Sequence, residues 1–163
     1  MPVVPGQYDP HLGSFMTTPD AGPPELPPAL LAAYEATAYR VQLPGSPAVT
    51  VRVGRTAPAL DDALSQAGAA SWAFVTAHNP GPRRLSRAVN TRRAAALVRA
   101  VRRRGLSVWP AAGLGHSGGP TESGVAILGA TTHDALALGR AFGQLAVLHG
   151  RCGGPVHLLL STP

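Results

Sequence analysis

The segment from Ser86 to Arg104 constrains the fold most, because its apolar and charged residues separate onto two sides of a helix. At 100° per residue, Leu97 and Val101 share one face with Asn90, whereas most of the arginines fall on the opposite face. Ser86 is suited to cap this helix, and Gly105 to end it. We therefore expect the helix to pack on a sheet and to point its arginines toward water.

Short apolar or alternating runs predict the strands of that sheet, at residues 39–43, 49–53, 72–77, 106–109, 125–128, 145–149 and 156–160. Further helices are predicted over 27–34, over 56–66 with Thr56 as its cap, and over 131–142, where Thr131 and Asp134 form a capping box. The resulting order is αββαβαββαββ. Because hairpins flank the middle of the chain, we expect an α+β fold. We predict a two-layer α/β sandwich on a mixed, largely antiparallel sheet with helices packed on it.

The 163 residues allow one domain and a tail. Residues 1–28 hold eight prolines with glycines between them, and they offer little to bury. We expect a disordered arm over 1–28 and a single α/β domain over 29–163. A flexible loop is predicted over 113–119, where glycines cluster.

Nine of the fourteen arginines lie between Asp62 and Glu122, a tract without acidic residues, and the chain has no lysine. Positive charge without acidic partners attracts nucleic-acid phosphates or an acidic protein. One hypothesis is therefore nucleic-acid binding through Arg83, Arg84, Arg87, Arg92, Arg99, Arg102 and Arg103. Three observations weaken it. A high-GC coding bias also replaces lysine with arginine, arginines at a helix end favour the helix dipole, and few aromatics are available to stack on bases.

Several familiar chemistries are excluded. Cys152 is the only cysteine, so neither an intrachain disulfide nor a cysteine-based zinc site can form. The six histidines lack metal-ligand spacing, and neither a phosphate-binding P-loop nor a dinucleotide-binding glycine motif occurs. We expect no metal and no cofactor. With no secretory signal and no membrane-spanning apolar stretch, the expected location is the cytoplasm.

Polar residues at buried-looking positions are the candidates for a site. Asn79 follows directly from a predicted buried strand, where α/β folds place ligand contacts. It could instead make a turn with Pro80. Asn90 lies on the apolar face of the arginine-rich helix, and its buried amide needs partners. One turn into the helix, it could reach back to Asn79, either as a structural brace or as a ligand contact.

Glu122, Arg140 and Gln144 complete the candidate set. Glu122 is the lone acid in a basic stretch, and it could pair with an arginine or act as a general base. It is therefore a weak catalytic candidate. Arg140 and Gln144 are four residues apart on a predicted helix, so they could grip an oxyanion or a base edge together. Alternatively, Arg140 pairs with Glu122 and Gln144 caps free main-chain carbonyls.

Four segments, 72–80, 90–93, 122–129 and 138–144, together resemble a bacterial domain-of-unknown-function family, number 3293. The resemblance implies a small bacterial α/β domain without an assigned activity, and its polar positions coincide with the candidate residues. The leading hypothesis is a domain that binds a small anionic or nucleotide-like ligand in one polar pocket. The ligand-binding residues would be Asn79, Asn90, Glu122, Arg140 and Gln144. The residues do not decide whether the protein is an enzyme.

Overall fold

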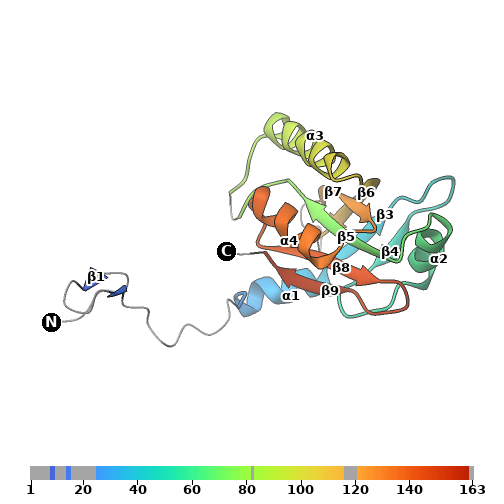
Figure 1. Ribbon diagram of the computed structural model, residues 1–163, viewed down its shortest axis with the longest axis horizontal. Helices are drawn as coiled ribbons and strands as arrows, with labels where there is room; N and C mark the ends of the chain where they lie inside the picture. Colours follow the sequence, from blue (N-terminus) through green and yellow to red (C-terminus); the bar gives the residue numbers. More distant parts are fainter. Residues whose placement is uncertain (1–7, 10–13, 16–24, 82, 116–120, 162–163) are drawn as a thin grey trace.

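A seven-stranded sheet forms the body of the protein (Figure 1). The computed structural model describes residues 8–9, 14–15, 25–81, 83–115 and 121–161. The strand order is β4-β3-β6-β7-β5-β8-β9, and every neighbouring pair is antiparallel. The strands are β3 (Ala38–Val41), β4 (Val49–Val51), β5 (Ser71–Thr76), β6 (Ser107–Leu114), β7 (Thr121–Leu128), β8 (Ala146–Arg151) and β9 (His157–Leu160).

Four helices accompany the sheet: α1 (Pro28–Ala36), α2 (Pro58–Gln66), α3 (Arg87–Arg103) and α4 (Thr132–Ala141). From α1 onward the order is αββαβαββαββ, which confirms the predicted succession and the α+β class. Of the arm expected over 1–28, the structure describes only residues 25–28 and a two-stranded pair, β1 (Tyr8–Asp9) with β2 (Ser14–Phe15). The rest of that prediction lies outside the described residues.

The sheet is covered on both faces, so the predicted two-layer arrangement is not confirmed. On one face, Leu97 of α3 and Leu138 of α4 pack with Val75 and Ile127. On the other face, Leu60 and Leu64 of α2 pack in a second cluster with Tyr39, Val41, Trp72, Phe74, Ala126 and Leu148. The two clusters take alternate residues of β5, because successive strand side chains point to opposite faces. The antiparallel pairing also corrects the mixed sheet that we expected.

The longest helix, α3, forms as its sequence predicts. The Ser86 hydroxyl accepts a hydrogen bond from the Val89 N–H at 3.2 Å, and Gly105 ends the helix with φ of 74°. Asn90, Leu97 and Val101 are buried. The arginines at positions 92, 99, 102 and 103 are exposed, which confirms the predicted division of the helix into two sides.

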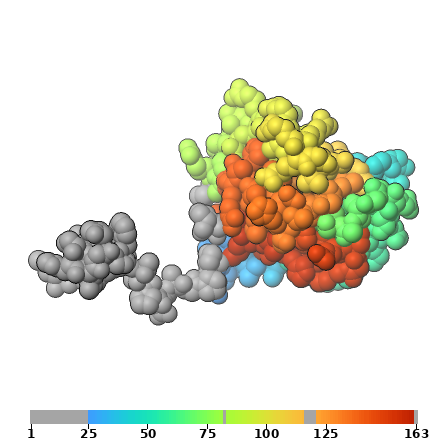
Figure 2. Space-filling view, in the orientation of Figure 1, coloured from blue at the N-terminus to red at the C-terminus, as the bar shows by residue number. Residues whose placement is uncertain are grey.

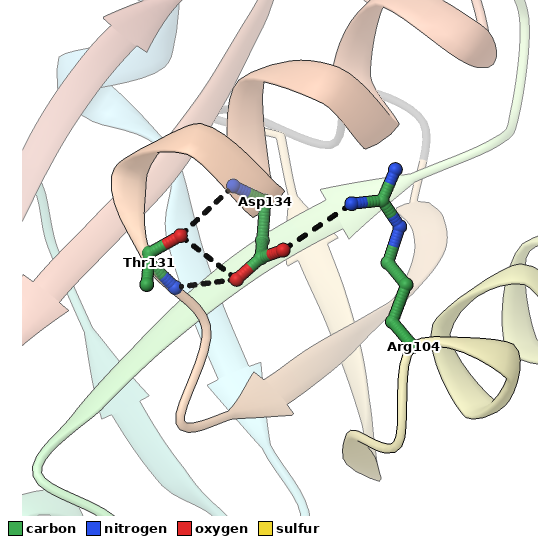
Figure 3. A network of polar contacts seen from close by, with 3 residues as sticks. All are labelled: Arg104, Thr131 and Asp134. Carbon is green, nitrogen blue, oxygen red and sulfur yellow. Dashed lines mark hydrogen bonds and ion pairs between the residues drawn. The ribbon is translucent and has the colours of Figure 1, made fainter.

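Helix α4 begins with the predicted capping box, and this box is tied to the end of α3 (Figure 3). The Thr131 hydroxyl accepts from the Asp134 N–H at 3.1 Å, and the Asp134 carboxylate accepts from the Thr131 N–H at 3.0 Å. Arg104 lies 3.2 Å from the other carboxylate oxygen. These hydrogen bonds, with that from the Thr131 backbone foremost, hold the pKa of Asp134 below its usual value.

Two local predictions are wrong. Helix α2 is capped by Ala57 with Pro58 at its first position, and Thr56 instead forms a bridge with Pro155. Residues 113 and 114, expected in a loop, lie in β6 because they pair with β7; residues 116–119 of that loop are outside the described residues. None of the helices in the described part of the chain combines the length and apolar character of a membrane span.

Candidate functional site

A cavity of about 410 Å³ lies between α1 and the face of the sheet that carries Phe74 and Leu148. This volume falls within the range of small-molecule sites. Most of its wall is apolar, and the residues responsible are Leu30, Ala33, Phe74, Leu145, Ala146, Leu148 and Leu158. Helix α1 closes one side although none of its own residues is fully buried. The cavity is therefore an apolar space beneath a lightly packed helix.

Strand register brings a carboxylate into this cavity. Tyr39 of β3 pairs with Gly113 of β6, and Gly113 pairs with Glu122 of β7, so the three residues form one row across the sheet. Because Gly113 has no side chain, the Tyr39 ring can lie across it; a Cβ there would stand 3.4 Å from that ring. The half-buried Glu122 therefore faces the cavity next to Tyr39, and both residues line it.

Asn79 and Asn90 form a reciprocal pair at the end of β5. The Asn90 Oδ1 accepts from the Asn79 N–H at 3.1 Å, and the Asn90 Nδ2 donates to the Asn79 Oδ1 at 3.0 Å. The Leu85 N–H donates to the same Asn79 oxygen at 2.9 Å. This network fixes Asn79 at φ of 43°, a left-handed conformation that asparagine tolerates better than most residues. Asn90 is therefore a brace for the loop, and it does not line the cavity.

The brace leaves the Asn79 side-chain nitrogen directed at Glu122, to whose Oε1 it donates at 3.3 Å. Gln144 reaches the same end of the cavity, and its Nε2 donates to the His78 carbonyl at 3.0 Å. Gln144 lies there because α4 stops before it: Gly143 has φ of 69°, and the Gln144 N–H bonds to the Gly139 carbonyl at 2.9 Å. Asn79, Glu122 and Gln144 thus meet from three separate segments.

Arg140 lies apart from this group. It is exposed in the last turn of α4 and does not line the cavity. The prediction that Arg140 and Gln144 project from one helix face is wrong, because the helix ends between them at Phe142. Pairing with Glu122 is not observed either: Arg104–Asp134 is the only ion pair within the described residues.

The electrostatic character of the cavity comes from Glu122. Burial raises the pKa of the Tyr34 and Tyr39 hydroxyls, and the carboxylate of Glu122 raises both further. No arginine is among the described residues that line the cavity. Glu122 and Gln144 both line this space, and the Glu122 carboxylate and the Gln144 Oε1 are acceptors, so the polar end favours a hydrogen-bond donor over an anion.

Arg93 is a structural residue that the sequence reasoning passed over. Its Nε donates to the Ala77 carbonyl at 2.7 Å, and a second nitrogen donates to the Phe142 carbonyl at 2.5 Å. Its guanidinium also lies 5.9 Å from the centre of the Phe142 ring. The sequence feature that could have identified Arg93 is its position three residues after Asn90, because this spacing places both residues on one face of the helix. Arg93 therefore ties the end of β5 to the end of α4.

Three aromatic residues that line the cavity, Tyr34, Tyr39 and Phe74, were also absent from the predicted site. The Phe74 ring packs against Tyr39 with centroids 5.0 Å apart. In the sequence, Phe74 has the pattern of an ordinary core residue in a buried strand. Tyr34 lies in a short helix, and the sequence does not show which part of the fold this helix packs against. In the described part of the chain, no group of three histidine, cysteine or acidic residues is placed to hold a metal ion.

The described residues thus form an α+β fold that contains a predominantly apolar cavity of small-molecule size. The family model described as "Protein of unknown function (DUF3293)" matches residues 75–147, which confirms the resemblance carried by the four motifs. All five candidate residues lie inside the matched segment, whereas α1, Tyr34 and Tyr39 lie outside it. No curated protein and no solved structure matches the chain.

Proposed function

We propose that this protein binds a small molecule with an apolar body and a polar head group in the cavity beneath α1. The observation that carries the proposal is the meeting of Asn79, Glu122 and Gln144 at one end of a largely apolar space. Three polar side chains in one apolar cavity are costly unless they are paired, and a bound head group would complete their hydrogen bonds.

The charge of the cavity changes the expected ligand. An anionic or nucleotide-like ligand would place its phosphate or carboxylate near Glu122, without an arginine among the described lining residues to offset the repulsion. Arg140 points elsewhere, and the arginines of α3 lie on the opposite face of the sheet. The proposal is therefore restricted to neutral or donor-bearing molecules. Among the described lining residues, Glu122 is the candidate base, and the proposal concerns binding alone.

The test uses two neighbouring alanines of α1. Both alanines are exposed, but Ala33 lines the cavity and Ala32 does not. We expect the neutral probe 4-phenylbutan-1-ol to shift amide NMR signals of β8 and α1 in the wild-type protein. Ala33→Trp should fill the cavity and abolish these shifts, while Ala32→Trp should retain them. Equal binding by both variants, or no binding by the wild type, would refute the proposal.

Native mass spectrometry of protein purified from its own host extends this test to the natural ligand. A retained mass in the wild-type protein that disappears in Ala33→Trp and persists in Ala32→Trp would support the cavity as its site. A retained mass that is the same in both variants would place the ligand elsewhere.

A second candidate function rests on the exposed arginines. Arg93 and Arg104 of the basic tract are engaged in internal contacts. The other seven are exposed and have no acidic partner within the described residues: Arg83, Arg84, Arg87, Arg92, Arg99, Arg102 and Arg103. In Figure 2 the α3 segment stands out at the top of the body, open to solvent. This surface supports binding to the phosphate backbone of a nucleic acid.

Its test is a salt titration of DNA and RNA oligonucleotide binding by fluorescence anisotropy. Each phosphate contact contributes about 0.9 to the slope of log K against log salt. Replacing Arg99, Arg102 and Arg103 together by glutamine should lower the slope by about 2 to 3. The same change at the exposed Arg40, Arg55 and Arg151 is the charge-matched control. Absence of binding at low salt, or equal losses in both triple variants, would contradict a nucleic-acid role and leave an acidic protein as the partner for this face.

A further inference from the structure

The polar end of the cavity carries a negative charge against aromatic walls, and this combination selects among possible ligands. Glu122 lines the cavity together with the rings of Tyr34, Tyr39 and Phe74. An aromatic face attracts an organic cation, and a carboxylate forms its strongest hydrogen bonds with a charged donor. We infer that the ligand is a small organic cation, an amine with an apolar tail, whose ammonium group binds Glu122. This inference rests on the proposed function.

The hydrogen bonds already made within the site support this assignment. The Glu122 Oε1 accepts from the Asn79 side chain at 3.3 Å, and no other described residue donates to the carboxylate. Gln144 uses its Nε2 for the carbonyls of His78 and Phe142, at 3.0 and 3.3 Å, so the Oε1 is the atom of this amide with which it can bind a ligand. An ammonium group carries three donors and no acceptor, which suits two acceptors of this kind.

The loop that holds Asn79 makes the carboxylate a fixed partner. Asn79 is held by its reciprocal bonds with Asn90 and by the Leu85 N–H, so it keeps Glu122 oriented without neutralising it. The field of this carboxylate also reaches both tyrosines, since it opposes the ionisation of Tyr34 and Tyr39. A cation entering the cavity therefore finds a preorganised anion and does not have to displace a cationic side chain from among the described lining residues.

The apolar part of the ligand follows from the rest of the wall. Leu30 of α1, Leu148 of β8 and Leu158 of β9 leave an apolar space behind the polar end. A volume of about 410 Å³ accommodates a phenyl ring on a chain of several carbons. A bare ammonium or an amino acid would leave this space unfilled, so an alkylaryl amine is the appropriate chemical class.

The experiment compares three probes of one skeleton by isothermal titration calorimetry at pH 7: 4-phenylbutylamine, 4-phenylbutan-1-ol and 4-phenylbutanoate. They carry one positive charge, no charge and one negative charge. We expect the wild-type protein to bind the amine about tenfold more tightly than the alcohol, and the carboxylate most weakly. In Glu122→Gln the preference for the amine over the alcohol should fall to about threefold or less.

Glu35→Gln is the control, because Glu35 is an exposed carboxylate on α1 that does not line the cavity. It should keep the full preference for the amine. A second measurement needs no variant: added NaCl should weaken binding of the amine and leave binding of the alcohol unchanged.

The outcomes separate the two proposals. Equal affinities for amine and alcohol in the wild-type protein would overturn the inference and leave the proposed function standing. An amine preference that survives in Glu122→Gln, or that is equally lost in Glu35→Gln, would also overturn it. Failure of all three probes to bind would refute the proposed function itself.

Discussion

Replacing Asn90 by alanine should destabilise the fold, because the Asn90 amide is the main support of the loop after β5. Asn90 is only 7% exposed. Asn90→Ala removes the acceptor of the Asn79 N–H and the donor to the Asn79 Oδ1, bonds of 3.1 and 3.0 Å. A buried donor left without a partner costs about 1–3 kcal/mol. The higher helix propensity of alanine offsets about 0.5 kcal/mol of this loss in the free energy of unfolding. The net loss should be about 2 kcal/mol.

Urea unfolding followed by tryptophan fluorescence and circular dichroism measures this loss. Trp72 is buried at 1% exposure, so its emission reports the loss of the core. With a slope of about 2 kcal/mol per molar urea, the midpoint should fall by about 1 M without a change in slope. Arg92→Ala, at an exposed position of the same helix, is the matched control and should change stability by less than about 0.5 kcal/mol. If Asn90→Ala is no more harmful than this control, the bracing role is wrong.

Two further predictions concern contacts between elements. Arg93→Met should lose about 2 kcal/mol, because two partly buried carbonyls lose their charged donor, whereas Arg92→Met at the adjacent exposed position should be nearly neutral in the same urea assay. Asp134→Asn should lower stability by about 1 kcal/mol at pH 7 through the weakened cap. Since the pKa of Asp134 is lowered in the folded state, its contribution is complete above the unfolded pKa of about 3.9 and is lost as the pH falls through the lower folded pKa. The wild-type advantage in thermal unfolding should therefore shrink below about pH 4, and a difference that stays constant from pH 7 to pH 2.5 would contradict the assignment.

The order of helices and strands was predictable because local chemistry dictates it. The helix from Ser86 to Gly105 carries its cap, its apolar stripe and its stop in consecutive residues. The capping box of Thr131 and Asp134 marks the start of α4 in the same way. Helix α2 shows the limit of such reasoning, because Pro58 can begin a helix without a capping side chain. Thr56 is therefore not needed as a cap, and it pairs with Pro155 in an isolated β-bridge.

The layering of the sheet depends on information that no local pattern contains. The helices α2 and α3 pack on opposite faces, and only the strand order and register decide which face each helix covers. Register also explains why strands β6 and β7 extend further than their apolar cores indicate. Gly113 and Glu122 have little intrinsic preference for a strand, and they join the ladder because they pair with each other.

The site was predictable where a polar residue interrupts an apolar pattern. Asn90 on a buried helix face and Glu122 next to a buried strand stand out in this way, and the structure brings both into contact with Asn79. The prediction that places Arg140 beside Gln144 was wrong, because it assumed that the helix continues through Gly143. Tyr34 and Phe74 could not be found, because an aromatic residue that lines a cavity has the same sequence pattern as one that fills a core.

The most direct test of a ligand site at Glu122 is a crystal structure of the protein grown with 4-phenylbutylamine. We expect the ammonium nitrogen within hydrogen-bonding distance of a Glu122 carboxylate oxygen, with the phenyl ring between Phe74 and Leu148 beneath α1. An amine bound at any other surface would contradict this account, as would an empty cavity in which Asn79 and Glu122 no longer touch.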